Sequence, residues 1–208
     1  MRSPPVVYVV DDDEAVRDAV GTFLRQAGFH VKAYDSGKAF LSAFSPQDLG
    51  CVVLDLSMPE MDGFEVQKQL VQSAARIPVI FMTAFGTVRD SVSAIKAGAF
   101  DFLEKPCSRE NLLACIQEAI REAESARLGE QIEAEGQARF DSLSPRERQI
   151  LGLIAQGLSS KQIARRLEIS PRTVDAHRAR LMIKMQASSM AELGVMAARH
   201  QGIAEPAS

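Results

Sequence analysis

The first half of the chain alternates short apolar runs with amphipathic stretches, and this alternation constrains the fold more than any other feature. Five apolar runs are expected to be strands: Val6–Val10, His30–Tyr34, Cys51–Leu54, Val79–Met82 and Phe100–Leu103. The stretches that follow them are expected to be helices: Glu14–Ala27, Gly37–Phe44, Gly63–Ser73, Val88–Ala97 and Ser108–Ala123. Five β-α repeats with short loops predict an open, doubly wound α/β domain with a five-stranded parallel sheet.

From Ser142 onward the pattern is helical throughout, and a serine precedes each expected helix. Capping-box patterns begin at Ser144, Ser159 and Ser189, and Ser170-Pro171 begins a further helix. Four helices are therefore expected, which predicts an all-α domain over residues 142–208. The α/β domain is placed at residues 1–122, and residues 123–141 form a linker that is either a helical extension or a flexible tether.

Composition and charge limit the partners of the two halves. The net charge of −3 hides an acidic excess in the first two-thirds and a basic excess from Ser142 onward, which predicts a cation for the first part and a polyanion for the second. No apolar run reaches the length of a membrane span, and the start of the chain lacks the pattern of a signal peptide. Three cysteines without metal-ligand spacing predict reduced thiols and a cytoplasmic protein.

Polar residues follow the expected strands at the edge where open α/β sheets bind their ligands. Asp11 and Asp12 follow the first strand, Asp55 the third, Thr83 the fourth and Lys105 the fifth. Crowded carboxylates need a cation, and Mg²⁺ suits an all-oxygen ligand set. A carboxylate beside Mg²⁺ can attack phosphorus and become an aspartyl phosphate. Taken alone, the acidic run is equally consistent with a solvated turn before a helix, so the prediction depends on the joint occurrence of these residues.

The motifs that carry these residues resemble the receiver domains of two-component systems. They are Val-Val-Asp-Asp-Asp at 9–13, Val-Leu-Asp-Leu-Ser-Met-Pro-Glu-Met-Asp-Gly at 53–63, Met-Thr-Ala at 82–84, Lys-Ala-Gly-Ala at 96–99 and Phe-Leu-Glu-Lys-Pro at 102–106. The resemblance covers roughly residues 4–122. It implies a flavodoxin-like fold in which Asp55 accepts a phosphoryl group from a sensor histidine kinase.

The resemblance also implies roles for the neighbouring residues. Asp11, Asp12, Asp55 and the carbonyl of Ser57 would hold Mg²⁺, while Thr83 and Lys105 would bind phosphoryl oxygens. Phe102 matches the aromatic switch position, although a core aromatic on the last strand is equally consistent with the sequence. The Lys105–Pro106 bond would be cis.

Three positions bear on how this chain departs from the common pattern of the family. Cys107 stands where Phe is common, which changes a packing contact. Phe85 and Ser57 lie two residues after Thr83 and Asp55, where the family tunes hydrolysis. We hypothesise that the apolar Phe85 cannot orient a water and lengthens the lifetime of the phosphate. Faster dephosphorylation of the wild type than of Phe85→Glu would contradict this.

The third helix of the second half, Pro171–Met185, has one core-facing stripe and one basic face. Val174, His177, Leu181 and Met185 have the spacing of a buried stripe. The opposite face carries small residues between cations, which would let the helix enter a major groove. The alternative interpretation of the cations is a solvated helical surface, and that of His177 is a partly buried packing residue.

The order of these helices resembles the LuxR-type helix-turn-helix. The motifs are Leu-Ser-Pro-Arg-Glu-Arg-Gln-Ile-Leu at 143–151, Gly-Leu-Ser-Ser-Lys-Gln-Ile-Ala-Arg-Arg-Leu at 157–167 and Ile-Ser-Pro-Arg-Thr-Val-Asp-Ala-His-Arg at 169–178. The resemblance implies base contacts by Asp175, Ala176 and Ala179. It implies phosphate contacts by Lys161, Arg165, Arg172, Thr173 and Lys184. The last helix, Met190–His200, would pair subunits on DNA.

Together the two halves resemble response regulators of the FixJ/NarL family. The predicted function is phosphorylation-dependent DNA binding and control of transcription, with a sensor histidine kinase, double-stranded DNA and a second copy of the chain as partners. Dimerisation is expected on phosphorylation, through Val88–Lys96 and Asp101–Lys105, or on DNA. The chain is not expected to be an enzyme, beyond assisting its own phosphorylation and dephosphorylation. Two alternatives remain: a metal-dependent phosphatase with Asp55 as nucleophile, and a constitutive DNA binder whose first domain is a dimerisation scaffold.

Overall fold

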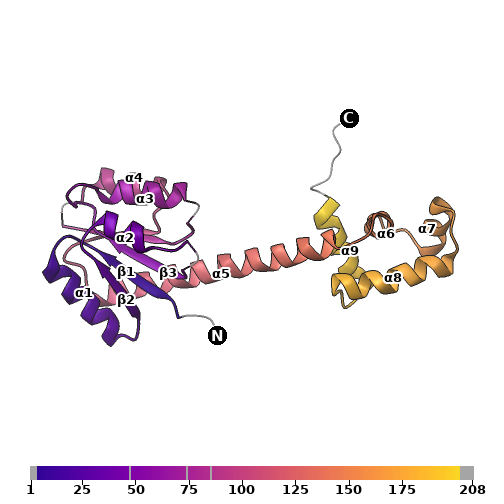
Figure 1. Cartoon of the computed structure of the whole chain (residues 1–208), viewed down its shortest axis with the longest axis horizontal. Helices are drawn as coiled ribbons and strands as arrows, with labels where there is room; N and C mark the ends of the chain where they lie inside the picture. Colours follow the sequence, from indigo (N-terminus) through magenta and orange to yellow (C-terminus); the bar gives the residue numbers. More distant parts are fainter. Residues whose placement is uncertain (1–3, 47, 74, 85, 202–208) are drawn as a thin grey trace. The chain divides into compact units, whose positions relative to one another are not determined.

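The computed structural model describes residues 4–46, 48–73, 75–84 and 86–201 (Figure 1). Its contacts divide the chain into two compact units, Met1–Arg127 and Leu128–Ser208, and each is described by itself. None of the helices in the described ranges is long and apolar enough to cross a membrane.

The first unit contains the expected parallel sheet. Its strands are β1 (Val6–Val10), β2 (His30–Tyr34), β3 (Gly50–Leu54), β4 (Val79–Thr83) and β5 (Asp101–Glu104). They lie in the order β2-β1-β3-β4-β5, and every neighbouring pair is parallel. The bounds of β3, β4 and β5 differ by one residue from those expected. The expected bounds followed the apolar runs, whereas the backbone pairing also includes Gly50 opposite Val6 and Thr83 opposite Glu104.

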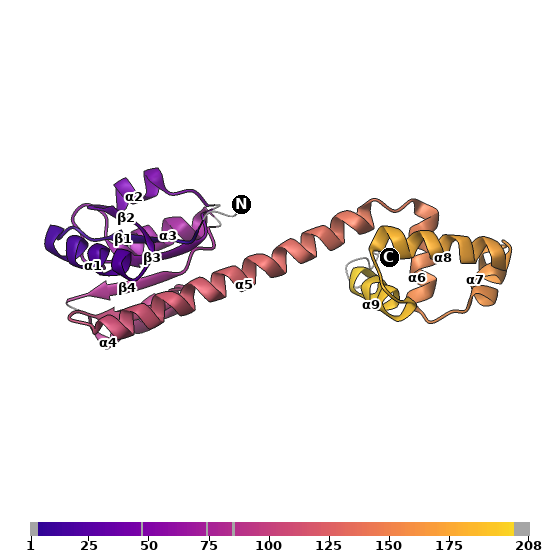
Figure 2. The ribbon, with the colours of Figure 1, turned by 90° about the horizontal axis from the view of Figure 1, so that it is seen from below.

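Helices cover both faces of this sheet (Figure 2). They are α1 (Glu14–Gln26), α2 (Gly37–Ala43), α3 (Gly63–Gln72), α4 (Val88–Lys96) and α5 (Arg109–Asp141). One core cluster joins the sheet to α2, α3 and α4, and the other joins it to α1 and α5. The first four helices end one residue earlier than expected, because the last expected residue is the C-cap. Gly28 and Gly98 then have φ values of 91° and 92°, as the left-handed ends of α1 and α4 require.

The three cysteines lie in the cluster beneath α1 and α5. Cys51 and Cys115 are buried, and Cys107 is half-buried; all three are free. Burial raises the pKa of the Cys51 and Cys115 thiols to about 12. These two side chains therefore stay protonated at neutral pH and act as small apolar groups in the core.

Helix α5 is longer than the fifth helix expected from the sequence and includes residues 123–141. Of the two alternatives for this segment, the structure contains the helical one. Polar pairs one turn apart support it: Gln131 donates to Glu135 at 3.0 Å, and Gln137 donates to Asp141 at 3.0 Å. Such pairs stabilise a helix that has few apolar anchors.

The described part of the second unit, up to Gln201, contains four further helices around one core. They are α6 (Pro145–Ala155), α7 (Ser160–Leu167), α8 (Pro171–Met185) and α9 (Met190–Gln201). Val174, Leu181 and Met185 are buried and His177 is half-buried, which confirms the stripe expected on α8. Ser144 and Ser159 form the expected reciprocal capping boxes.

The expected capping box at Ser189 forms only in part. The Glu192 N–H donates to Ser189 Oγ at 3.1 Å, but the Glu192 carboxylate accepts from the Ser188 N–H at 2.7 Å instead of returning to Ser189. A second serine directly before the cap offers the carboxylate this alternative donor.

Candidate functional site: an acidic pocket and a basic helix pair

The order of the strands brings the ends of β1 and β3 together at the edge where the connections of the sheet change direction. The Asp55 N–H donates to the Val10 carbonyl at 2.8 Å, so Asp11 and Asp55 leave adjacent strands side by side. This is the position at which doubly wound sheets bind ligands. Asp11 and Asp55 are 1% and 6% exposed, so both residues are buried at this edge.

Lys105 lies between these two carboxylates. Its Nζ is 2.6 Å from Asp11 Oδ2 and 2.6 Å from Asp55 Oδ1. The Lys105 N–H donates to the Thr83 carbonyl at 2.7 Å, and the Lys105–Pro106 bond is cis, as expected. The fold therefore brings Asp11, Asp55, Thr83 and Lys105 from four different strand ends to one place.

The balance of charge in this pocket is negative, because one ammonium serves two carboxylates. Burial raises the pKa of the Asp55 carboxyl above its usual value, and Asp11 adds to the rise, although Lys105 and the Ser57 N–H oppose it. Burial lowers the pKa of Lys105, but its contacts with Asp11 and Asp55 outweigh burial and leave that pKa raised. Lys105 therefore stays charged at neutral pH. Its single positive charge can neutralise only one of the two carboxylates when both are ionised.

The loop after β3 holds Asp55 in place through close backbone contacts. The Ser57 N–H donates to Asp55 Oδ2 at 2.7 Å. Asp62 caps α3, and the next residue, Gly63, lies so close that a Cβ there would be 2.6 Å from the Asp55 carbonyl oxygen. Only glycine fits this approach, which explains the Asp-Gly pair in the sequence.

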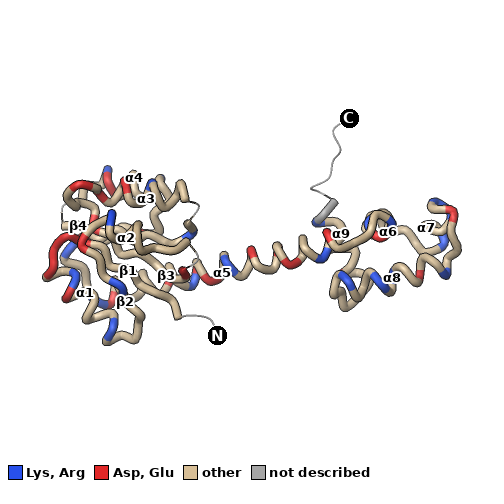
Figure 3. The backbone as a smooth tube through the Cα atoms, viewed as in Figure 1, with Lys and Arg blue, Asp and Glu red and all other residues tan. Residues whose placement is uncertain are grey.

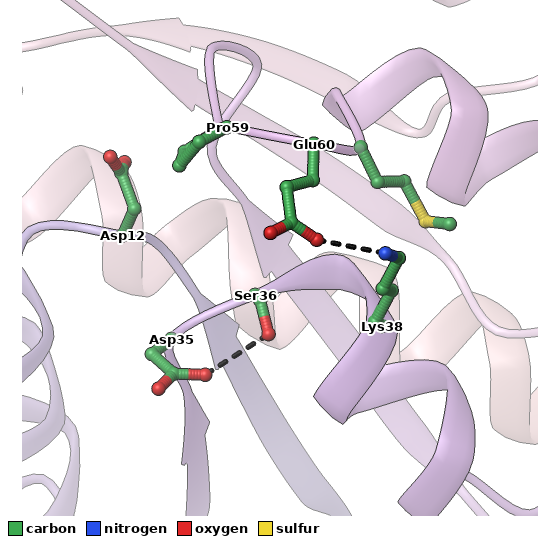
Figure 4. Close-up of a pocket in the computed structure, with 7 residues that line it drawn as sticks. Asp12, Asp35, Ser36, Lys38, Pro59 and Glu60 are labelled. Atoms are coloured by element: carbon green, nitrogen blue, oxygen red, sulfur yellow. Dashed lines mark hydrogen bonds and ion pairs between the residues drawn. The ribbon is translucent and has the colours of Figure 1, made fainter.

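Asp12 is exposed and lies in a neighbouring pocket of about 340 Å³. Figure 4 shows Asp12 on one side of this pocket and Asp35, Ser36, Lys38 and Glu60 on the other, with Lys38 paired to Glu60. In the described part of the chain, no three His, Cys, Asp or Glu side chains are already grouped as a metal site. The structure thus joins Asp11 and Asp55 through Lys105, while Asp12 faces the adjacent pocket.

Thr83 is the last residue of β4, and Phe102 lies within β5, where it pairs with Phe81 of β4. Thr83 is buried, and Phe102 is half-buried with its ring 6.2 Å from that of Phe81. Gly86 lies beside both side chains and leaves no room for a side chain of its own. A Cβ there would be 2.7 Å from the Phe102 ring and 3.0 Å from Thr83 Cγ2. The hypothesis about Phe85 falls outside the described residues.

We expect Gly86→Ala to displace the Phe102 ring. The added methyl overlaps the ring, so the substitution should lower the free energy of unfolding by about 1 kcal/mol. Urea denaturation measures the loss. The control adds Gly86→Ala to a Phe102→Leu variant, because the smaller side chain makes room for the methyl. Equal losses with and without Phe102→Leu would show that the ring is not the obstacle.

Helices α7 and α8 present the residues expected to meet DNA, and Figure 3 shows Lys and Arg along both helices. The following predicted contacts are all exposed: Lys161, Arg165, Arg172, Thr173, Asp175, Ala176, Ala179 and Lys184. Thr173 also contacts the α8 cap, because its Oγ1 lies 2.8 Å from Ser170 Oγ. The structure therefore gathers this set on one accessible helix pair.

Two contacts in this unit are not apparent from the sequence. Lys184 Nζ lies 2.8 Å from Glu147 Oε2, which ties α8 to α6. Arg178 donates through Nη1 to Ser160 Oγ at 2.8 Å and through Nη2 to the Leu158 carbonyl at 3.2 Å. The helical pattern places Lys184 and Arg178 on a basic face, but it cannot show which acceptors a neighbouring helix supplies.

Glu147 is expected to stabilise the second unit in a pH-dependent way. Its contacts with Lys184 and Ser144 lower the pKa of the Glu147 carboxyl from 4.5 to about 2. Because the folded-state pKa is lowered, the stabilisation is complete above pH 4.5 and is lost as the pH falls toward 2. Glu147→Gln should cost about 1 kcal/mol at pH 7, since Lys184 is partly exposed. Urea denaturation of both proteins at pH 7 and pH 3 tests this; a cost independent of pH would contradict it.

Comparison with known proteins identifies the class of protein. Residues 7–117 match the family described as "Response regulator receiver domain", and residues 141–197 match the family described as "Bacterial regulatory proteins, luxR family". The chain belongs to the response regulators that combine a receiver domain with a LuxR-type DNA-binding domain. It is a transcription regulator of a two-component system, controlled by phosphorylation, which confirms the predicted fold class and function.

Relatives of similar length support this assignment. The chain is 48% identical over 194 residues to "Transcriptional regulatory protein FixJ" of Bradyrhizobium diazoefficiens, covering 93% of this chain and 94% of the relative. Among solved structures it is similar to response regulator StyR, with a TM-score of 0.88, 39% identity and coverage of 95% and 100% of the two chains. It is also similar to full-length FixJ from B. japonicum, with a TM-score of 0.60, 44% identity and coverage of 98% and 100%.

Proposed function

We propose that Asp55 is the phosphoacceptor of this regulator. The observation that carries the proposal is the position of Lys105 Nζ, 2.6 Å from both Asp55 and Asp11 at the ends of β3 and β1. A carboxylate oxygen of Asp55 attacks the phosphorus of a phosphohistidine on a sensor kinase, and the P–N bond breaks with its electron pair going to the imidazole. Lys105 and the Thr83 hydroxyl would then hold the phosphoryl oxygens.

A divalent cation fits the donor chemistry of this pocket. Two buried carboxylates share one ammonium, so the pocket has an unbalanced negative charge. Asp11, Asp12, Asp55 and the Ser57 carbonyl would hold Mg²⁺, a hard cation that prefers oxygen ligands. Such an ion would supply charge neutralisation for an incoming phosphoryl group, beyond what Lys105 alone provides. Beyond its own phosphorylation and dephosphorylation, we propose no catalytic activity.

The surface of α4 supports a change of assembly on phosphorylation. Val88, Val92 and Ile95 lie along one side of α4 and are 82%, 46% and 48% exposed. A stripe of this kind is unusual on a monomer and fits a second copy of the chain. We propose that movement of Thr83 shifts Phe102 and alters this α4 surface, so that the phosphorylated protein dimerises. On DNA, α9 would pair subunits through its exposed Met190 and Val195.

We propose that α8 is the recognition helix and that α7 supports it on double-stranded DNA. Lys161, Arg165, Arg172 and Thr173 would contact phosphates, and the small side chains of Ala176 and Ala179 would allow close approach to the bases. Asp175 would accept from a base amino group. Lys184 would also contact a phosphate, but its ammonium would then be shared between that phosphate and the Glu147 carboxylate.

Mass spectrometry after incubation with Mg²⁺ and acetyl phosphate or phosphoramidate tests the proposal. We expect one added phosphoryl group on the wild type and none on Asp55→Asn. Asp62→Asn is the matched control, because Asp62 lies in the same loop but caps α3 through a hydrogen bond that Asn can replace. Absence of modification on the wild type would overturn the proposal and favour a receiver that serves only as a dimerisation scaffold.

A further inference from the structure

Ser160 connects the two helices of the DNA-binding unit through one hydroxyl group. It is the first residue of α7, and its Oγ donates to Asp175 Oδ1 of α8 at 2.6 Å. The same Oγ accepts from Arg178 Nη1 at 2.8 Å. Because Arg178 can only donate and the carboxylate can only accept, the direction of both hydrogen bonds is fixed.

Arg178 extends this connection to the loop before α7. Its Nη2 donates to the Leu158 carbonyl at 3.2 Å, so one guanidinium holds both the loop and the first residue of α7. Asp175 and Arg178 are three residues apart on α8 and therefore share one face of that helix. The hydroxyl of Ser160 completes a chain of hydrogen bonds from the Leu158 carbonyl to the Asp175 carboxylate.

This chain of hydrogen bonds limits what Asp175 can do on DNA. Oδ1 already accepts from Ser160, whereas Oδ2 makes no hydrogen bond to any described residue. A carboxylate held through one oxygen has lost much of its rotamer freedom and presents the other oxygen in a defined direction. Such an oxygen suits a single acceptor contact with the amino group of a base, for example the N4 amino group of cytosine in the major groove.

We propose that Ser160 is a positioning residue that sets the base preference of this regulator by orienting Asp175. The proposal rests on the assignment of α8 as the recognition helix and of Asp175 as a base contact. Ser160 acts through the carboxylate and does not itself read a base. It follows that removing the Ser160 hydroxyl alters discrimination between sequences more than it alters general affinity for DNA, since the substitution removes no cation.

The test measures base preference with the full-length protein. Duplexes selected by the wild type from a random-sequence library serve as the probe, and each base pair of the selected site is then varied. Fluorescence anisotropy gives the dissociation constants of the wild type, Ser160→Ala, Ser160→Thr, Asp175→Ala and the double variant Ser160→Ala/Asp175→Ala. Ser142→Ala is the matched control, because its hydroxyl bonds to the Arg139 carbonyl in α5 and not to α7 or α8.

We expect Asp175→Ala to reduce discrimination at one base pair by about tenfold. Ser160→Ala should reduce discrimination at the same base pair, with affinity for random-sequence duplex within about twofold of the wild type. Ser160→Thr, which keeps a hydroxyl, should restore the preference, and the double variant should discriminate no worse than Asp175→Ala alone. Ser142→Ala should behave as the wild type.

Two different failures can be told apart. If Asp175→Ala relaxes the preference while Ser160→Ala leaves it intact, the positioning role of Ser160 is wrong and the base contact stands. If neither substitution changes any preference, the assignment of Asp175 as a base contact fails as well. Should Ser160→Ala fold poorly in thermal denaturation, Ser160→Cys takes its place, because a thiol is close to serine in size but only a weak hydrogen-bond donor. An unchanged base preference in Ser160→Cys would then overturn the positioning role.

Discussion

Lys105→Met is expected to destabilise the receiver unit by about 3 kcal/mol at pH 7.5. The substitution keeps an aliphatic side chain of similar length but removes the ammonium that lies 2.6 Å from Asp11 and Asp55. Two buried carboxylates then lie side by side without a cation. Removing one partner of a buried ion pair is strongly destabilising because it leaves a buried charge without compensation. Urea denaturation of the wild type and the variant gives the difference in the free energy of unfolding.

The pH dependence of this loss distinguishes charge from packing. Without Lys105 the pKa of Asp55, already raised by burial, rises further, so the folded state holds a proton that the unfolded state has released. The variant should therefore lose stability as the pH rises from 5 to 7.5 more steeply than the wild type. Lys38→Met is the matched control, because its ion pair with Glu60 is 63% and 73% exposed and should contribute almost nothing. Similar losses in both variants would contradict this account.

Most of the fold could be predicted because periodicity and strand-end residues agree. The five apolar runs became β1 to β5, and the polar residues after them met at one edge because parallel strands end together. What could not be predicted was how the charges would be shared. The run of aspartates separates into Asp11, which turns inward to Lys105, and Asp12, which lines a neighbouring pocket (Figure 4). The periodicity of the sequence predicts that both aspartates follow β1 at the edge of the sheet. It does not predict where each side chain points, because that depends on contacts with residues from other strands, such as Lys105 after β5.

The DNA-binding unit shows the same limit in a different form. The boundaries of α8 agree with those expected, since Pro171 starts the helix and Met185 ends its buried stripe. The pattern identified its basic face but could not separate cations facing solvent from those bound to neighbouring helices. Lys184 and Arg178 belong to the second group through Glu147 and Ser160. Helical spacing records which residues share a face, and only tertiary structure shows which partner that face meets.

The second large effect expected is a gain in stability from loss of the phosphoacceptor. Asp55→Asn, which should abolish phosphorylation, should raise the free energy of unfolding by about 2 kcal/mol at pH 7. The substitution removes the buried negative charge of Asp55, which shares the Lys105 ammonium with Asp11. Lys105 and Asp11 then form an ion pair with no net charge. Because the folded-state pKa of Asp55 is raised, its carboxylate costs stability above that pKa and not below the unfolded value near 4.

The gain should therefore be full at pH 7 and disappear as the pH falls toward 4, and urea denaturation across this range measures it. Asp18→Asn, an equal change of charge at an exposed position of α1, should stay within about 0.5 kcal/mol of the wild type. If Asp55→Asn is instead less stable than the wild type at pH 7, the ion pair with Lys105 outweighs the burial of the carboxylate. A gain in stability would mean that the wild-type receiver is less stable because it keeps a carboxylate at the end of β3 whose charge is only partly neutralised. That carboxylate remains reactive toward phosphorus, and a divalent cation can neutralise the remaining charge.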